Sequence, residues 1–153
     1  MHREFNHRGF SMVELVLVLS LIGIMSAVYF SFADFTGSSL DRAARRLESD
    51  LRYAQQMATA EETNFGVITN NATTYTVYRV NPATPVTDPY TRLPLVLNFA
   101  SGYDSASFGA NYQVEFDSVG RPVVGGGTQF VIGLNGKQRT VTVTATTGYV
   151  QVQ

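Results

Sequence analysis

The stretch HRGFSMVELVLVLSLIGIMSAVYF, residues 7–30, decides how this chain is organised. It overlaps a longer apolar run, Phe10–Ala33, in which Glu14 is the only charged residue. A helix rises about 1.5 Å per residue, so this run is long enough to cross the roughly 30 Å hydrocarbon layer of a bilayer. Arg3 and Arg8 precede the run, which favours a cytoplasmic N-terminus and a head across the membrane. The sequence therefore predicts one membrane-spanning helix.

A plain membrane anchor and a conventional secretory signal are two simpler interpretations of the run. Small residues at Ser31 and Ala33 would suit a secretory signal, but the apolar region of such signals is only about 7–15 residues long. Neither interpretation explains Glu14, because an acidic group at mid-depth in a membrane helix costs about 2.5–3.5 kcal/mol. Acidic groups in such positions are candidate functional residues.

The residues around Glu14 resemble the class III leader that type IV pilins share with type II secretion pseudopilins. That leader is short and basic and ends in Gly, followed by an aromatic residue and by Glu at the fifth mature position. Arg8, Gly9, Phe10 and Glu14 match it position by position. The resemblance implies that a prepilin peptidase cleaves between Gly9 and Phe10 and methylates the new Phe10 amine.

The resemblance also implies a location and a set of partners. The chain would be a single-pass protein of the bacterial inner membrane, with a periplasmic head, and would contact membrane lipid. It would then join a filament with other pseudopilins or pilins, through an inner-membrane assembly platform.

Glu14 has a physical reason to act in assembly. Cleavage creates a cationic amine at Phe10, one helical turn from the Glu14 carboxylate. In a staggered bundle, Glu14 of an incoming subunit can face the Phe10 amine of the subunit ahead. Opposite charges attract far more strongly out of water, while an unpaired carboxylate there remains costly. We therefore predict that Glu14 is an assembly residue.

Residues 40–62, LDRAARRLESDLRYAQQMATAEE, have the pattern of an amphipathic helix. Gly37–Ser39 predict a kink or break before it, with a new helix start near Asp41. Apolar residues recur every three or four positions and form one stripe: Leu40, Ala44, Leu47, Leu51, Ala54 and Ala58. The segment LESDLRYAQQMA resembles the second helical signature of the GspH/FimT class of minor pseudopilins and pilins. The matching residues are Leu47, Asp50, Leu51, Arg52 and Ala54.

From Asn64 onward the apolar residues alternate with polar ones, as in strands. We expect strands within residues 64–70, 73–80, 111–117, 128–134, 139–145 and 149–153. The Asn135-Gly136 pair suits a tight hairpin turn, and Val141, Val143 and Ala145 should face inward. Strands with one polar face favour an antiparallel sheet packed against the helix. FDSVGRPV (residues 116–123) and TGYVQV (residues 147–152) also resemble the C-terminal half of the same class.

The predicted fold class is α+β and type IV pilin-like, with a long N-terminal helix packed on an antiparallel β-sheet head. The expected parts are a cleaved leader at 1–9, a transmembrane helix at 10–33, its amphipathic continuation at 34–62 and the head at 63–153.

Residues 81–110 match no family motif. Four prolines make this segment mostly loop, with a strand expected near Leu93–Phe99. A surface loop without a partner is one interpretation. Connections of this length in compact domains are often functional, so a partner or cargo of the head is expected here first.

The composition argues against an enzyme. The chain has no cysteine, and both histidines, His2 and His7, lie in the first nine residues. Without them, Ser-His and Cys-His catalysis are excluded and only carboxylates remain as metal-ligating side chains. Asp104, Glu115 and Asp117 lack the spacing of a calcium loop, and the glycines at 125–127 predict a turn. We expect no cofactor and no metal.

Nucleic acid is not an expected partner. DNA-binding relatives carry a basic C-terminal tail, with Arg after the glycine that corresponds to Gly148; here Tyr149 follows. Loss of the leader leaves 9 basic and 11 acidic residues, a formal charge of −2. Lys137 and Arg139 are therefore only weak candidates for phosphate contacts.

Departures from the family pattern indicate a minor subunit. Major pilins usually have Pro at mature position 22, where this chain has Ser31, and the disulfide-closed C-terminal loop of many pilins is absent. The resemblance thus favours a minor pseudopilin of a type II secretion system, at or near the tip of a periplasmic pseudopilus that drives protein export. The alternative is a minor pilin of a type IV or mannose-sensitive-haemagglutinin-type pilus, acting in adhesion or DNA uptake.

Overall fold

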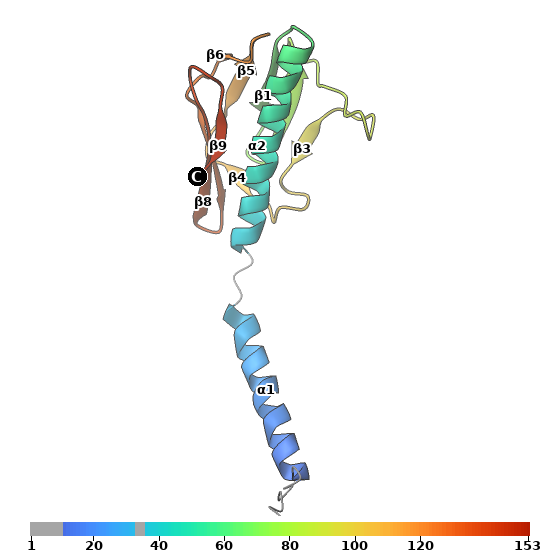
Figure 1. The fold of residues 1–153 in the computed structure, drawn as a ribbon, viewed down its shortest axis with the longest axis vertical. Coiled ribbons are helices and arrows are strands. Elements are labelled where there is room, and N and C mark those ends of the chain that lie inside the picture. Colours follow the sequence, from blue (N-terminus) through green and yellow to red (C-terminus); the bar gives the residue numbers. More distant parts are fainter. Residues whose placement is uncertain (1–10, 33–35) are drawn as a thin grey trace, which may run out of the picture. The chain divides into compact units, whose positions relative to one another are not determined.

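A computed structural model of the chain describes residues 11–32 and 36–153. The described residues fall into two compact units, one within residues 1–34 and the other within 35–153. The first contains helix α1, Met12–Phe32, and the second contains helix α2, Thr36–Ala60, with all the strands that the described residues form. Figure 1 shows α2 lying along the strands of the second unit. We describe each unit by itself.

Helix α1 is apolar on every side. Its side chains from Met12 to Tyr29 are all exposed, and this segment of 18 residues, with a mean hydropathy of 2.2, is long and apolar enough to cross a membrane. Ser11 caps the helix, because its hydroxyl accepts a hydrogen bond from the Val13 N–H at 3.3 Å. A helix without a polar face suits a lipid environment.

Helix α2 buries the predicted apolar stripe against the strands. The buried side chains are Leu40, Ala43, Ala44, Leu47, Leu51, Ala54 and Ala58. The break predicted at Gly37–Ser39 is wrong, because the helix begins at Thr36 and continues through Asp41. Buried Leu40 and hydrogen bonds from Ser39 to Asp104 and from Arg42 to Ser39 hold this turn in place. Such tertiary contacts outweigh the low helix propensity of one glycine.

The strands form two antiparallel sheets, whereas the sequence predicted one. The five-stranded sheet has the order β3 (Val96–Asn98), β2 (Thr74–Arg79), β1 (Phe65–Thr69), β5 (Gln113–Phe116) and β6 (Pro122–Val124). The four-stranded sheet has the order β4 (Ser107–Phe108), β7 (Gln129–Leu134), β8 (Lys137–Val143) and β9 (Val150–Val152). In Figure 1, β3 and β9 lie on opposite sides of α2, so the helix covers both sheets. The predicted fold class, a helix on an antiparallel head, is confirmed.

The register of the strands places the alternating apolar residues on the side of α2. Val67 of β1 is opposite both Val77 and Val114, and all three side chains are buried. The Asn135-Gly136 turn between β7 and β8 is confirmed, with φ of 49° and 78°. Val141 and Val143 face inward as predicted, but Ala145 is exposed because β8 ends at Val143.

Aromatic side chains connect the two sheets beneath α2. Tyr75 of β2 packs against Phe99, with ring centroids 5.6 Å apart, and Phe99 packs on Phe108 of β4 at 5.1 Å. Tyr112 continues the contact toward Phe130 of β7 at 5.0 Å. Rings at these separations stabilise each other beyond their burial. The core therefore spans both sheets.

Candidate functional site

The candidate assembly residue lies at the start of α1. Glu14 is in the first helical turn and is exposed, and it is the only charged residue between Met12 and Phe32. The predicted cleavage site, Gly9 and Phe10, lies outside the described residues. The helix thus presents one negative charge on an apolar surface, where a neighbouring positive group would be its natural partner.

A buried ionic cluster joins α2 to β2. Asp50 is 5% exposed, and its Oδ2 accepts hydrogen bonds from the Tyr75 hydroxyl at 2.7 Å and from Arg46 Nε at 3.1 Å. Burial raises the pKa of Asp50, although both hydrogen bonds oppose that effect. Burial and the nearby Asp50 carboxyl also raise the pKa of Tyr75 well above its usual value. The Asp of the helical signature therefore has a structural role inside the head.

We expect Asp50→Asn to change how the stability of the head depends on pH. Because burial holds the pKa of Asp50 above its ordinary value, ionising this carboxyl costs more in the folded chain than in the unfolded chain. Its stabilising contribution is complete below the unfolded pKa and is lost as pH rises through the folded pKa. The free energy of unfolding of the wild type, relative to Asp50→Asn, should therefore fall as the pH rises above about 4.

Urea unfolding of the full chain in detergent, followed by tyrosine fluorescence, measures this difference. The chain has eight tyrosines and no tryptophan, so this signal is available. The control, Tyr75→Phe, removes the hydroxyl donor but keeps the titrating carboxyl, so it should keep the pH dependence. The free energy of unfolding of the wild type minus that of Asp50→Asn should fall with pH. If this difference stays constant, or grows toward neutral pH, the raised pKa of Asp50 is contradicted.

The two C-terminal segments that resemble the family meet beneath one side chain of α2. Gln55 Nε2 donates hydrogen bonds to the carbonyl oxygens of Gly120 at 2.7 Å and Thr147 at 3.2 Å. Gly148 has φ of 69°, and a Cβ atom there would lie 2.6 Å from the Gly120 oxygen. Only glycine fits so close an approach in this left-handed conformation. We call this contact the Gln55 junction; it explains why the second segment carries a glycine at position 148.

A second polar cluster lies around Tyr78 and Glu115. The Tyr78 hydroxyl donates to Glu115 Oε2 at 3.0 Å and accepts from Gln113 Nε2 at 2.9 Å, while Asn64 Nδ2 donates to Glu115 Oε1 at 2.7 Å. Burial is the main reason that the pKa of Tyr78 is raised to about 12. Gly66 leaves room for this ring, because a Cβ atom there would be 2.6 Å from it. Glu115 therefore holds the Tyr78 side chain in place.

The other carboxylates considered at the outset lie apart from Glu115. Asp104 accepts a hydrogen bond from Ser39 of α2, while Asp117 accepts from the backbone N–H groups of Val119 and Arg121. The Arg121 N–H is the main cause of the lowered pKa of Asp117. Among the residues that the structure describes, no group of three or more His, Cys, Asp or Glu side chains is placed to hold a metal ion.

The weak nucleic-acid candidates lie together on β8. Arg139 Nε forms an ion pair with Asp41 Oδ1 of α2 at 2.6 Å, and Lys137 begins the strand. The ion pair neutralises the Arg139 charge locally and holds its side chain against the helix. That arrangement leaves less positive potential for a phosphate backbone.

Part of the predicted loop at 81–110 is an ordered hairpin, which the sequence did not predict. Val86 N–H bonds to Val77 O at 2.8 Å, Leu95 N–H bonds to Val86 O at 2.7 Å, and Asp88 N–H bonds to Leu93 O at 2.9 Å. We call residues 84–95 the projecting hairpin. Only β3, Val96–Asn98, is formed within the strand expected at Leu93–Phe99. Proline spacing could have indicated the turns, but not the pairing with β2.

An apolar N-terminal helix, a second amphipathic helix and an antiparallel head define a type IV pilin-like protein. Among solved structures, the type IV minor pilin FimU of Pseudomonas aeruginosa PAO1 has this fold. Its P21 crystal form gives a TM-score of 0.57 at 19% identity, over 78% of this chain and 91% of that chain. Its P65 crystal form gives a TM-score of 0.55 at 20% identity, over 74% of this chain and 92% of that chain.

Family comparisons identify the chain more closely. The family described as Type II transport protein GspH matches residues 43–147, and the prokaryotic N-terminal methylation motif matches residues 5–30. The chain belongs to the GspH family. No curated protein matches it.

These comparisons confirm the resemblance that the sequence indicated. The protein is a pilin-like subunit with a class III leader and an N-terminal apolar helix, as fits a membrane-anchored protein. Its family and fold are those of structural subunits, which assemble into filaments with other pilins or pseudopilins. The likeness to FimU, below 25% identity, concerns the fold.

Proposed function

We propose that this protein is a minor pseudopilin of a type II secretion system, at or near the tip of a periplasmic pseudopilus. The observation that carries the proposal is the GspH match, which covers residues 43–147 and so includes most of α2 and the head. The protein acts by its contacts, without catalysis: the clusters around Asp50 and Glu115 use their charges inside the head.

The N-terminal segment supplies processing, anchoring and assembly. Prepilin peptidase removes residues 1–9, cutting between Gly9 and Phe10, and methylates the Phe10 amine. Residues 10–33 then anchor the chain in the inner membrane, with 34–62 and the head at 63–153 on the periplasmic side. Glu14 supports this proposal as the only charge on α1, four residues after the new amine in the sequence. An ion pair with the amine of a neighbouring subunit sets the register of the filament.

A minor pilin of a type IV or mannose-sensitive-haemagglutinin-type pilus is the second candidate. The observation that favours it is the likeness of the fold to FimU, which is a type IV minor pilin. The same anchor, helix and head serve either filament, so the two candidates differ in the assembly machinery that the chain joins.

Deleting the gene in its own bacterium separates the two candidates. For a secretion pseudopilin, we expect exported proteins to accumulate in the periplasm instead of the medium, while surface pili remain. For a minor pilin, we expect pili to be lost while secretion continues. Restoring the wild-type chain should reverse the defect, and a chain with Gly9→Leu, which blocks cleavage, should not. Normal secretion in the deletion strain would contradict the secretion role.

A further inference from the structure

The projecting hairpin presents an aromatic side chain on an ordered turn. Tyr90, near its tip, is 94% exposed. The turn beneath it is held by Asp88, whose Oδ1 accepts from the Tyr90 N–H at 2.8 Å and whose carbonyl accepts from the Arg92 N–H at 2.8 Å. Because the backbone of this turn is ordered before binding, little backbone entropy is lost when Tyr90 docks, and tyrosines are frequent binding anchors.

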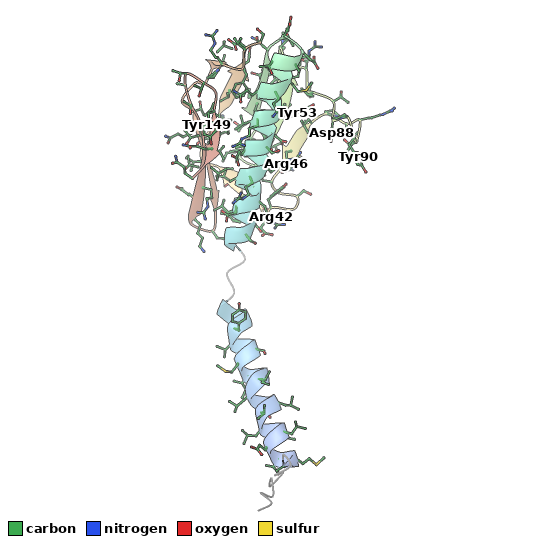
Figure 2. The ribbon with its side chains drawn as sticks, in the orientation of Figure 1. Arg42, Arg46, Tyr53, Asp88, Tyr90 and Tyr149 are labelled. Atoms are coloured by element: carbon green, nitrogen blue, oxygen red, sulfur yellow. The ribbon has the colours of Figure 1, made fainter. Side chains whose placement is uncertain are left out.

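A groove of about 780 Å³ lies between this hairpin and α2. Its lining is mainly apolar, with Tyr53 and Met57 from the helix, Phe65 from β1, Val80 directly after β2, and Pro85 and Val86 from the hairpin. A smaller hollow of about 260 Å³, lined by Arg46 and Ser49, adjoins it at Tyr53 and Pro89. Figure 2 shows Arg46 and Tyr53 on α2, with Asp88 and Tyr90 beyond them on the same side of the helix.

The charged side chains that line these hollows have partners within the chain. At one end, Arg79 forms an ion pair with Glu61 at 3.1 Å. At the other, Arg46 pairs with Asp50 at 3.1 Å, and Asp88 holds the hairpin turn. A charged occupant would lose its hydration without gaining a counter-charge. The groove is therefore complementary to an uncharged, apolar occupant, and it lacks the cluster of cations that nucleic acid or anionic lipid would need.

Val80 supports a role for the apolar lining. It is 61% exposed and has φ of 62°, a left-handed conformation that is strongly unfavourable for a β-branched residue. Asn or Gly would satisfy the backbone better at such a position. Backbone strain of this kind is concentrated at functional sites. Here it keeps an apolar side chain at the rim of the groove.

We propose that the groove and the projecting hairpin form one docking surface for an apolar, uncharged segment on another subunit of the same filament, with Tyr90 as the anchor. This inference rests on the proposed function, because it assumes that the chain assembles into a filament whose other subunits supply the occupant. From Arg46 to Ala60 the helix is about 21 Å long. That length accommodates about six residues of extended chain or four turns of a helix.

Photocrosslinking from position 90 tests the docking surface in the native membrane. A full-length chain with p-benzoylphenylalanine in place of Tyr90 should form an adduct with a different protein whose precursor carries a class III leader. The matched control has the same group in place of Tyr149, a second exposed tyrosine at 57%, which lies on the other side of α2 in Figure 2. The control should give at least about tenfold less of that adduct.

A pair of substitutions at Val80 separates docking from folding. Val80→Asn suits the left-handed backbone and keeps the groove uncharged, so it should leave the adduct within about twofold of wild type. Val80→Asp suits the same backbone but places an unpaired charge in the groove, so it should reduce the adduct at least about tenfold. Both variants should remain folded, which thermal unfolding of the full chain in detergent verifies.

Several outcomes would overturn the docking surface. These are an adduct with a second copy of this chain, with lipid, or with an exported protein that lacks a leader, and equal adducts from positions 90 and 149. An unchanged amount of adduct from Val80→Asp would also overturn the docking surface. The incorporation of the wild-type chain into filaments is measured alongside. If it is normal while the adduct is missing, only this inference fails; if the chain never enters filaments, the proposed function fails with it.

Discussion

A chain carrying Glu14→Ala is expected to reach the membrane and lose its leader normally, yet to be at least about tenfold depleted from filaments. Glu14 is the only charge on α1, and its removal makes the helix more favourable in the bilayer, because an acidic group in a membrane helix is costly. Anchoring therefore cannot be weakened by this change. What is lost is the carboxylate that we propose pairs with the amine of a neighbouring subunit.

The amount of the chain in purified filaments, divided by the amount in membranes, measures this effect. The mass of the mature chain verifies cleavage before Phe10. Glu14→Gln should fail like Glu14→Ala, because it keeps the size of the side chain but not its charge. Ser20→Ala in the same helix is the matched control: it removes a hydroxyl that bonds only to Val16 O, at 2.8 Å, and should assemble normally. Equal incorporation of wild type and Glu14→Ala would refute the assembly role.

Gly148→Ala is expected to lower the stability of the head strongly. The new Cβ would lie 2.6 Å from the Gly120 oxygen and 2.7 Å from Gln55 Nε2, the two atoms of one hydrogen bond in the Gln55 junction. Residue 148 also has φ of 69°, where alanine itself is unfavourable. We expect the free energy of unfolding to fall by about 3–4 kcal/mol, a large part of the total for a domain of this size.

Gly136→Ala is the control for this prediction. Gly136 has φ of 78°, close to that of Gly148, but a Cβ atom there would meet nothing within 4 Å. Gly136→Ala should therefore lower the free energy of unfolding only by the cost of placing alanine in a left-handed conformation, about 1–2 kcal/mol. Urea unfolding of both variants gives the difference, which isolates the clash at the junction. Similar losses in the free energy of unfolding for Gly148→Ala and Gly136→Ala would mean that the Gln55 junction accommodates the new Cβ without a clash.

The sequence predicted those features that local patterns determine. The spacing of Leu40, Ala44 and Leu47 indicated the buried face of α2, and Asn135-Gly136 indicated a hairpin turn; both are confirmed. The class III leader pattern and the helical signature led to the correct family. In each case the relevant residues lie close together in the chain, so their spacing carries the information.

Features that depend on distant residues could not be predicted. Alternating strands fit one sheet as well as two, and the pairing of β1 with β5 joins residues far apart in the sequence. Asp50 lies between Ser49 and Leu51 on α2, and only its bond to Tyr75 shows why it is buried. The projecting hairpin depends on Val77, whose backbone bonds to both Val86 and Leu95. The helix start at Thr36 depends on contacts that Ser39 and Leu40 make with the head.

The cross-links along α2 have a mechanical consequence. Asp41 is tied to Arg139, Asp50 to Tyr75 and Gln55 to Gly120, so the helix is fastened at three levels to strands or turns of both sheets. A force that arrives along the helix axis loads these bonds in shear. Because the three bonds share the load, they must break together. They cannot open one after another, as the teeth of a zipper do. A head fastened in this way can transmit thrust from the membrane end of the chain without peeling away from its own helix.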